Sequence, residues 1–112
     1  MKRGEIWTVS AGKGYAGKPR PAVIIQDNHF DATASIAVCV FTTDPTDAPL
    51  IRLVVEPSAT ETGLRDNRGL MVDKITTVPK NKVGERVGRL DDADIVRLNR
   101  AVLVFLGLAT AR

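Results

Sequence analysis

Short apolar runs, separated by polar stretches that contain glycine or proline, cover most of this chain and are typical of a small β-rich domain. The run over 35–41 is continuous and apolar enough to predict a central strand. The run over 69–78 is interrupted and predicts either a strand pair or one bent strand. Further strands are expected near 5–9, 21–26, 50–55 and 82–89.

The final segment changes from a strand pattern to a helical one. Asp91 or Asp92 can cap a helix N-terminus, and Gly107 is expected to end the helix. Steps of three or four residues predict an apolar face on the sheet, formed by Ile95, Leu98, Val102 and Phe105 and widened by Val96, Leu103 and Leu106. The predicted fold class is therefore mainly β with a C-terminal helix.

Length and composition place the chain among ordinary globular proteins. Its 112 residues predict one domain over 1–112, and 44% apolar content is typical of such domains. No apolar run approaches the roughly 20 residues that span a bilayer, and no secretory signal develops, so we expect a cytoplasmic protein. Cys39 is alone, which excludes an intrachain disulfide.

The positive charge is concentrated near the N-terminus. The net charge is +3, and five cations precede residue 21 against the single Glu5: Lys2, Arg3, Lys13, Lys18 and Arg20. Such a cluster can attract a phosphate backbone. It is equally typical of a solvated loop whose lysines confer solubility, and the sequence leaves both interpretations open.

Arg20 stands between Pro19 and Pro21, directly before the apolar run Ala22–Ile25. The prolines restrict the backbone, so this arginine is held on a stiff segment that leads into a strand. A permanently charged guanidinium in such a position is suited to binding a phosphate. The alternative is a solvated arginine at the start of a strand.

The remaining chemistry has to come from few groups. His29 is the one histidine and is predicted to lie in a loop, so neither a Ser-His-Asp set nor a Cys-His pair is expected. No cysteine and histidine spacing indicates a zinc site, and we expect no metal and no cofactor. Arginine, hydroxyl and carboxylate groups suffice for RNA cleavage, because the 2′-hydroxyl of the substrate is itself the nucleophile.

Four blocks occur in order along the chain: Arg3-Gly4-Glu5-Ile6-Trp7, Arg20-Pro21-Ala22-Val23-Ile24-Ile25-Gln26, Thr42-Thr43 and Asp73-Lys74-Ile75-Thr76-Thr77. Together they resemble the MazF/PemK (Kid) family of toxin ribonucleases over nearly the whole chain. The resemblance implies a small SH3-like β-barrel of the MazF/Kid/CcdB type and metal-independent cleavage of single-stranded RNA. It also implies 2′,3′-cyclic phosphate and 5′-hydroxyl products, a homodimer, and a cognate antitoxin that blocks the RNA groove.

By the same resemblance, the catalytic arginine is Arg20 and the catalytic threonine is Thr42, with Thr43 as the next candidate. Asp73 is a candidate to orient Arg20 or to accept a proton. Plain β-propensity is the alternative for the threonines, and an ion pair with Lys74 or Arg68 is the alternative for Asp73.

RNA contacts are expected from the basic loop and the end of the third strand, through Lys13, Tyr15, Lys18 and Thr43. Tyr15 can stack on an unpaired base. Trp7 is expected in the core or in a dimer interface.

Two departures from the family pattern stand out. Several relatives have Ser-Glu-Gln ahead of the arginine block, where this chain has Gly14-Tyr15-Ala16 and no acid. Kid-like relatives have an arginine where this chain has Met71, two positions before Asp73. A non-catalytic RNA binder therefore stays open. Gyrase poisoning is disfavoured, since the C-terminal segment 108–112 lacks the Trp-Gly-Ile of gyrase-poisoning toxins.

Overall fold

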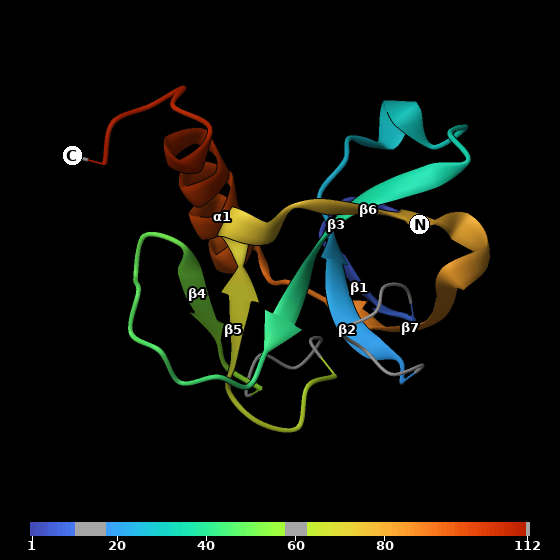
Figure 1. The fold of residues 1–112 in the computed structure, drawn as a ribbon, viewed down its shortest axis with the longest axis horizontal. Helices are drawn as coiled ribbons and strands as arrows, with labels where there is room; N and C mark the ends of the chain where they lie inside the picture. The colour runs from blue at the N-terminus through green and yellow to red at the C-terminus, as the bar shows by residue number, and fades with distance from the viewer. Residues whose placement is uncertain (11–17, 58–62, 112) are drawn as a thin grey trace.

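The computed structural model describes residues 1–10, 18–57 and 63–111, which form an antiparallel sheet and one α-helix (Figure 1). The strands and the helix are β1 (Glu5–Val9), β2 (Arg20–Ile24), β3 (Ser35–Thr42), β4 (Arg52–Val55), β5 (Arg68–Met71), β6 (Thr76–Pro79), β7 (Val83–Arg89) and α1 (Asp92–Phe105). Short 3₁₀ turns occupy Asn28–Phe30, Val72–Lys74 and Lys80–Lys82. The turn over 72–74 separates β5 from β6, so the interrupted run forms a strand pair rather than one bent strand.

The strand β3 organises the sheet, whose order is β4-β5-β3-β2-β1-β7 with β6 also paired to β3. Its first half pairs with β6, its middle with β2 and its last two residues with β5. The mainly β fold with a C-terminal helix is confirmed. The sheet is bent but not closed into a complete barrel, because among the described strands β4 and β7 each pair on one side only.

Alternate side chains of β3 enter two different apolar clusters, as expected for a strand buried on both faces. Cys39 and Phe41 belong to the cluster that also contains Leu98 and Ala101 of α1. Ile36, Val38 and Val40 belong to a second cluster on the opposite side of the strand. The sequence prediction of a central strand is confirmed.

The helix begins and ends where the sequence predicts. The Asp91 side chain accepts a hydrogen bond from the backbone N–H of Asp94 at 2.8 Å, which makes Asp91 the N-cap. Gly107 adopts a φ of 77°, a left-handed conformation that favours glycine and ends the helix.

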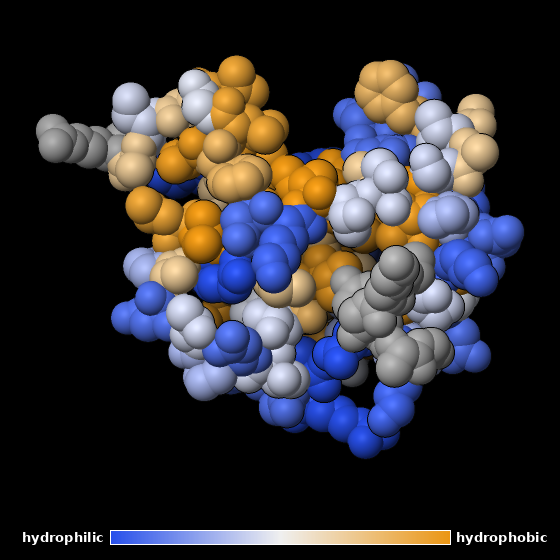
Figure 2. Space-filling model, in the orientation of Figure 1, coloured by the Kyte–Doolittle hydropathy of each residue, from blue (hydrophilic) through white to orange (hydrophobic). Residues whose placement is uncertain are grey.

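The apolar face of α1 is narrower than the sequence predicts. Only Leu98 and Ala101 are buried, whereas exposed apolar side chains continue around and beyond the helix: Val96, Leu103, Phe105, Leu106 and Leu108. In Figure 2 apolar atoms gather at the upper left, where Figure 1 has α1, and the lower part of the same view is largely hydrophilic. The assignment of Phe105, Val96, Leu103 and Leu106 to the packed face is therefore wrong, because periodicity does not reveal how wide a stripe the sheet covers.

The helix also contacts the outer edge of the sheet. The Arg97 guanidinium donates to the backbone carbonyl of Val54 on β4 at 3.1 Å and to the Asp94 carboxylate at 2.7 Å. No helix in the described part of the chain has the length and apolar character needed to cross a membrane.

Replacing the N-cap tests the assignment of the helix start. We expect Asp91→Ala to lower the free energy of unfolding by about 1 kcal/mol, because an N–H of the first turn loses its acceptor. Asp92→Ala is the matched control, since the Asp92 side chain is 97% exposed and should change stability by less than about 0.5 kcal/mol. Urea denaturation followed by circular dichroism measures both. Equal losses would contradict the assignment.

The reactivity of Cys39 tests the burial of β3. Burial raises the pKa of the Cys39 thiol to about 12, so almost no thiolate is present at neutral pH. We expect the native protein to resist iodoacetamide and to react fully in denaturant, as read by intact mass. Rapid alkylation of the native protein would show that β3 is not buried as described.

Candidate active site

Arg20 and Thr42 lie where two neighbouring strands part. The β2–β3 register ends at Ala22 opposite Val40. Beyond this pair β2 continues beside β1, with Arg20 opposite Val9, while β3 continues beside β5, with Thr42 opposite Gly69. The diverging strands form a fork at the lower edge of Figure 1.

Each of the two side chains stands two residues beyond the last pair, on its own arm of the fork. Because side chains alternate along a strand, Arg20 and Thr42 share a sheet face with Ala22 and Val40. Arg20 is exposed and Thr42 is half-buried. The register thus places these two predicted residues on the same sheet face, at the end where β2 and β3 diverge.

The Thr42 hydroxyl is held in a defined orientation. Its Oγ1 accepts a hydrogen bond from the backbone N–H of Asp44 at 3.1 Å. With that lone pair engaged, the hydroxyl hydrogen is free to donate to another acceptor. Thr43 is exposed and follows the end of β3.

A cleft of about 270 Å³ opens beside Thr42, at the same end of the sheet. Its lining comes from the end of β3, the following loop, β4 and the start of β5: Thr42, Thr43, Asp44, Pro45, Thr46, Arg52, Val54, Asn67, Arg68 and Gly69. Gly69 lies against two of these side chains, since a Cβ there would make ordinary van der Waals contacts, 3.6 Å from Thr42 Cγ2 and 3.9 Å from Arg52 Cδ.

Asp73 is paired with an arginine that the sequence analysis did not single out. Its carboxylate accepts a hydrogen bond from Arg52 Nη1, and the two side chains are only 22% and 18% exposed. Its ion-pair partner in the described structure is therefore neither Lys74 nor Arg68. Arg68 instead bonds Asp66, at 3.0 Å.

Arg52 escaped sequence reasoning because its importance depends on strand pairing. Arg52 lies directly opposite Met71 in the β4–β5 register, although 19 positions separate them in the chain. Arg52 thus brings an arginine next to Met71, the position at which Kid-like relatives have an arginine of their own. A sequence signal would have required knowledge of the β4–β5 register.

The other predicted residues are more dispersed. Lys18 is exposed just before β2, whereas Lys13 and Tyr15 lie outside the described residues. Trp7 packs partly against the second apolar cluster and donates to Glu5 at 3.1 Å. His29 is 90% exposed and pairs with Asp27 at 2.6 Å, consistent with a solvated loop histidine.

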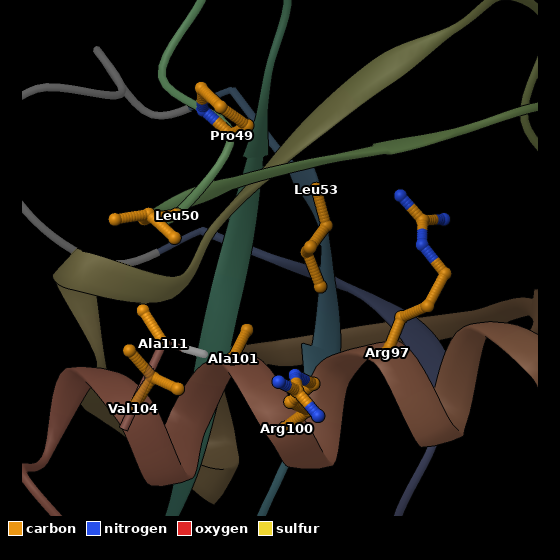
Figure 3. A pocket seen from close by; sticks show the side chains of 8 residues that line it. All are labelled: Pro49, Leu50, Leu53, Arg97, Arg100, Ala101, Val104 and Ala111. Atoms are coloured by element: carbon orange, nitrogen blue, oxygen red, sulfur yellow. The ribbon is translucent and has the colours of Figure 1, made fainter. Parts of the chain in front are cut away.

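A second hollow lies between α1 and the start of β4 (Figure 3). It measures about 250 Å³ and is mostly apolar, with Leu53, Ala101 and Val104 in its lining and Arg97 and Arg100 beside them. It contains none of the predicted catalytic residues. Within the described residues, no three His, Cys, Asp or Glu side chains are grouped so that they could hold a metal ion.

Comparison with known proteins gives a consistent result. The chain is 56% identical over 109 residues to a probable endoribonuclease MazF of Mycolicibacterium smegmatis, covering 97% of this chain and 99% of that protein. Among solved structures, an endoribonuclease from Mycobacterial species, in complex with its cognate antitoxin, superposes with a TM-score of 0.81 at 24% identity, covering 97% of both chains. MazF in a MazE–MazF complex from Deinococcus radiodurans superposes with a TM-score of 0.77 at 13% identity, again over 97% of both chains.

These structural similarities support the fold, and the sequence comparisons identify the family. The model of the family described as PemK-like, MazF-like toxin of type II toxin-antitoxin system matches residues 2–106. The chain belongs to this family of PemK-like and MazF-like toxins.

Proposed function

We propose that this chain is the endoribonuclease toxin of a type II toxin–antitoxin pair and cleaves single-stranded RNA at defined short motifs. The observation that carries the proposal is the strand register, which sets Arg20 and Thr42 on the two strands that diverge at this end of the sheet, with Thr42 at the edge of a cleft. Family membership and the 56% identical relative support the same activity. They also make a non-catalytic toxin the less favoured alternative.

The proposed reaction is an internal transesterification. The 2′-oxygen of the RNA attacks the adjacent phosphorus and loses its proton, and the bond from phosphorus to the 5′-oxygen breaks. The leaving oxygen takes up a proton. The products are a 2′,3′-cyclic phosphate and a 5′-hydroxyl, and the protein needs to supply no nucleophile, cofactor or metal.

Arg20 is proposed to bind the non-bridging oxygens of the scissile phosphate. Its planar guanidinium matches two such oxygens and remains positive throughout the reaction. Thr42 is proposed to donate its hydroxyl hydrogen to the same phosphate, since its Oγ1 already accepts from Asp44. Donors placed where negative charge develops stabilise the transition state without having to reorganise.

Asp73 is proposed to act through Arg52 rather than as an isolated base. Its carboxylate is bonded to the Arg52 guanidinium, and both side chains are mostly shielded from water. We therefore assign Asp73 as a positioning residue that holds Arg52 at the cleft beside Thr42.

The proposed RNA path extends from this fork toward the basic N-terminal region. Lys18 and Thr43 are exposed near the two arms and are proposed RNA contacts, as are Lys13 and Tyr15. We further propose that the domain over 1–112 works as a homodimer in the cytoplasm. Its activity there would be blocked by a cognate antitoxin, a partner of the kind bound to the related Mycobacterial endoribonuclease.

Cleavage of a long single-stranded RNA in excess EDTA tests the proposal. We expect the wild-type protein, freed of antitoxin, to cut at a few short motifs and to leave 5′-hydroxyl ends. Thr42→Ala should lower kcat/KM by about 10²–10³, because one transition-state donor is lost, and Arg20→Ala by at least as much. Thr43→Ala should cost less.

The matched control is Arg100→Gln, which removes an arginine from α1, away from the fork. It should cleave like the wild-type protein. Intact RNA with folded wild-type protein would disprove the nuclease assignment. Equal losses for Thr42→Ala and Thr43→Ala would disprove the specific role of Thr42.

A double-mutant cycle tests the positioning role of Asp73. We expect Asp73→Asn and Arg52→Gln each to slow cleavage, and the double variant to be no slower than the worse single variant, because the two groups act as a unit. Cleavage rates of all four proteins give the coupling, and thermal unfolding shows whether they remain folded. Additive losses would mean that Asp73 acts independently of Arg52.

A further inference from the structure

The cleft beside Thr42 combines hydrogen-bond donors and acceptors, and two arginines and one aspartate are its charged lining residues. Because Asp73 and Asp66 pair with these arginines from outside the lining, the five charged groups carry no excess of positive charge. Arg52 and Arg68 donate, Asp44 accepts, and Asn67 can do both. A phosphate-binding pocket needs an excess of cations, whereas the edge of a nucleobase presents donors and acceptors side by side. The polar composition therefore fits a base better than a phosphate.

Each charged side chain of the cleft is held by a polar partner. Asp73 bonds Arg52, Asp66 bonds Arg68 at 3.0 Å, and neither of these aspartates lines the cleft. Each arginine is thus oriented by an aspartate outside the lining, and Arg52 Nη1 also donates to the Ile51 carbonyl at 3.1 Å. A guanidinium has five N–H groups, so each arginine retains further donors for a ligand. A site whose groups are oriented before binding loses less entropy when the ligand arrives.

Asp44 is fixed in the same way, by the loop that follows β3. Its Oδ1 accepts from the Thr46 backbone N–H at 3.0 Å and from the Thr46 hydroxyl at 2.6 Å. These bonds hold the pKa of Asp44 below its ordinary value, so the carboxylate is charged at neutral pH. Its other oxygen can accept from the N–H groups of a base.

The dimensions and walls of the cleft also suit a flat ring. Pro45 and Val54 supply apolar surface, and Val54 is 52% exposed although it belongs to a strand. Because Thr42 forms one wall, a base bound here would belong to a nucleotide next to the cleaved bond.

We propose that this cleft binds the base of one nucleotide adjacent to the scissile phosphate, and that Asp44 and Arg68 determine which base is accepted. The proposal rests on the ribonuclease activity proposed above and adds the specificity of the same site. A carboxylate beside a guanidinium favours a base with an N–H donor and a carbonyl acceptor, namely guanine, cytosine or uracil. Adenine has no carbonyl and is disfavoured.

The test profiles cleavage of a randomised single-stranded RNA library by sequencing the 5′-hydroxyl products. We expect Asp44→Asn and Arg68→Gln to change the base preference at one position beside the cut by about tenfold, with the preferences elsewhere in the motif unchanged. Arg100→Gln should leave the whole motif as in the wild-type protein. Unchanged motifs in folded Asp44→Asn and Arg68→Gln would overturn the proposal.

Abasic substrates provide a second readout that does not depend on the stability of a variant. Removing the base on one side of the cut should lower kcat/KM of the wild-type protein about tenfold or more, and should cost Arg68→Gln much less. If neither neighbouring abasic site affects wild-type cleavage, the base-binding proposal is wrong although the ribonuclease proposal stands. If the wild-type protein cleaves no RNA, both proposals fall.

Discussion

The burial of β3 on both faces is the constraint on which the rest of the structure depends. A strand in that position has to hydrogen-bond along both edges and pack apolar side chains on both sides, which its sequence allows from Ile36 to Phe41. Its partners change along its length, from β6 to β2 and then β5. Where β2 separates from it, the chain reaches the surface with Arg20 on one arm and Thr42 on the other. The proposed catalytic groups are thus a direct outcome of how the core strand ends.

In the cleft beside Thr42, the positive charge of the arginines is balanced by paired aspartates. Arg52 and Arg68 reach it from neighbouring strands, and each is held by an aspartate from outside the lining. The Arg52–Asp73 pair is mostly shielded from water, so removal of either partner leaves a charge in an unfavourable environment. Fixed directions of the hydrogen bonds, rather than net charge, then distinguish ligands.

The order of strands along the chain, the helix and its two ends followed from the sequence, because they rest on local patterns of apolar residues, caps and glycine. Arg20 and Thr42 were singled out through their place in ordered sequence blocks, and their catalytic roles are proposals. Arg52 was not singled out, since its place beside the cleft arises only when β4, β5 and β3 lie side by side. The width of the packed helix face was overestimated for a related reason. Hydropathy marks Phe105 and Leu103 as apolar, but only the geometry of the sheet decides that they stay exposed.

The bond from Arg97 to the Val54 carbonyl has a consequence for association between chains. β4 is an outer strand, and an outer strand ordinarily offers its backbone groups to any extended segment that approaches, including one from another copy of the same protein. At Val54 the backbone carbonyl already accepts a hydrogen bond from the Arg97 guanidinium of α1, which the Asp94 carboxylate also binds. A second chain that tried to extend the sheet there would first have to break that bond. The Arg97 side chain of α1 thus disfavours the addition of another strand to the edge of the sheet next to the cleft.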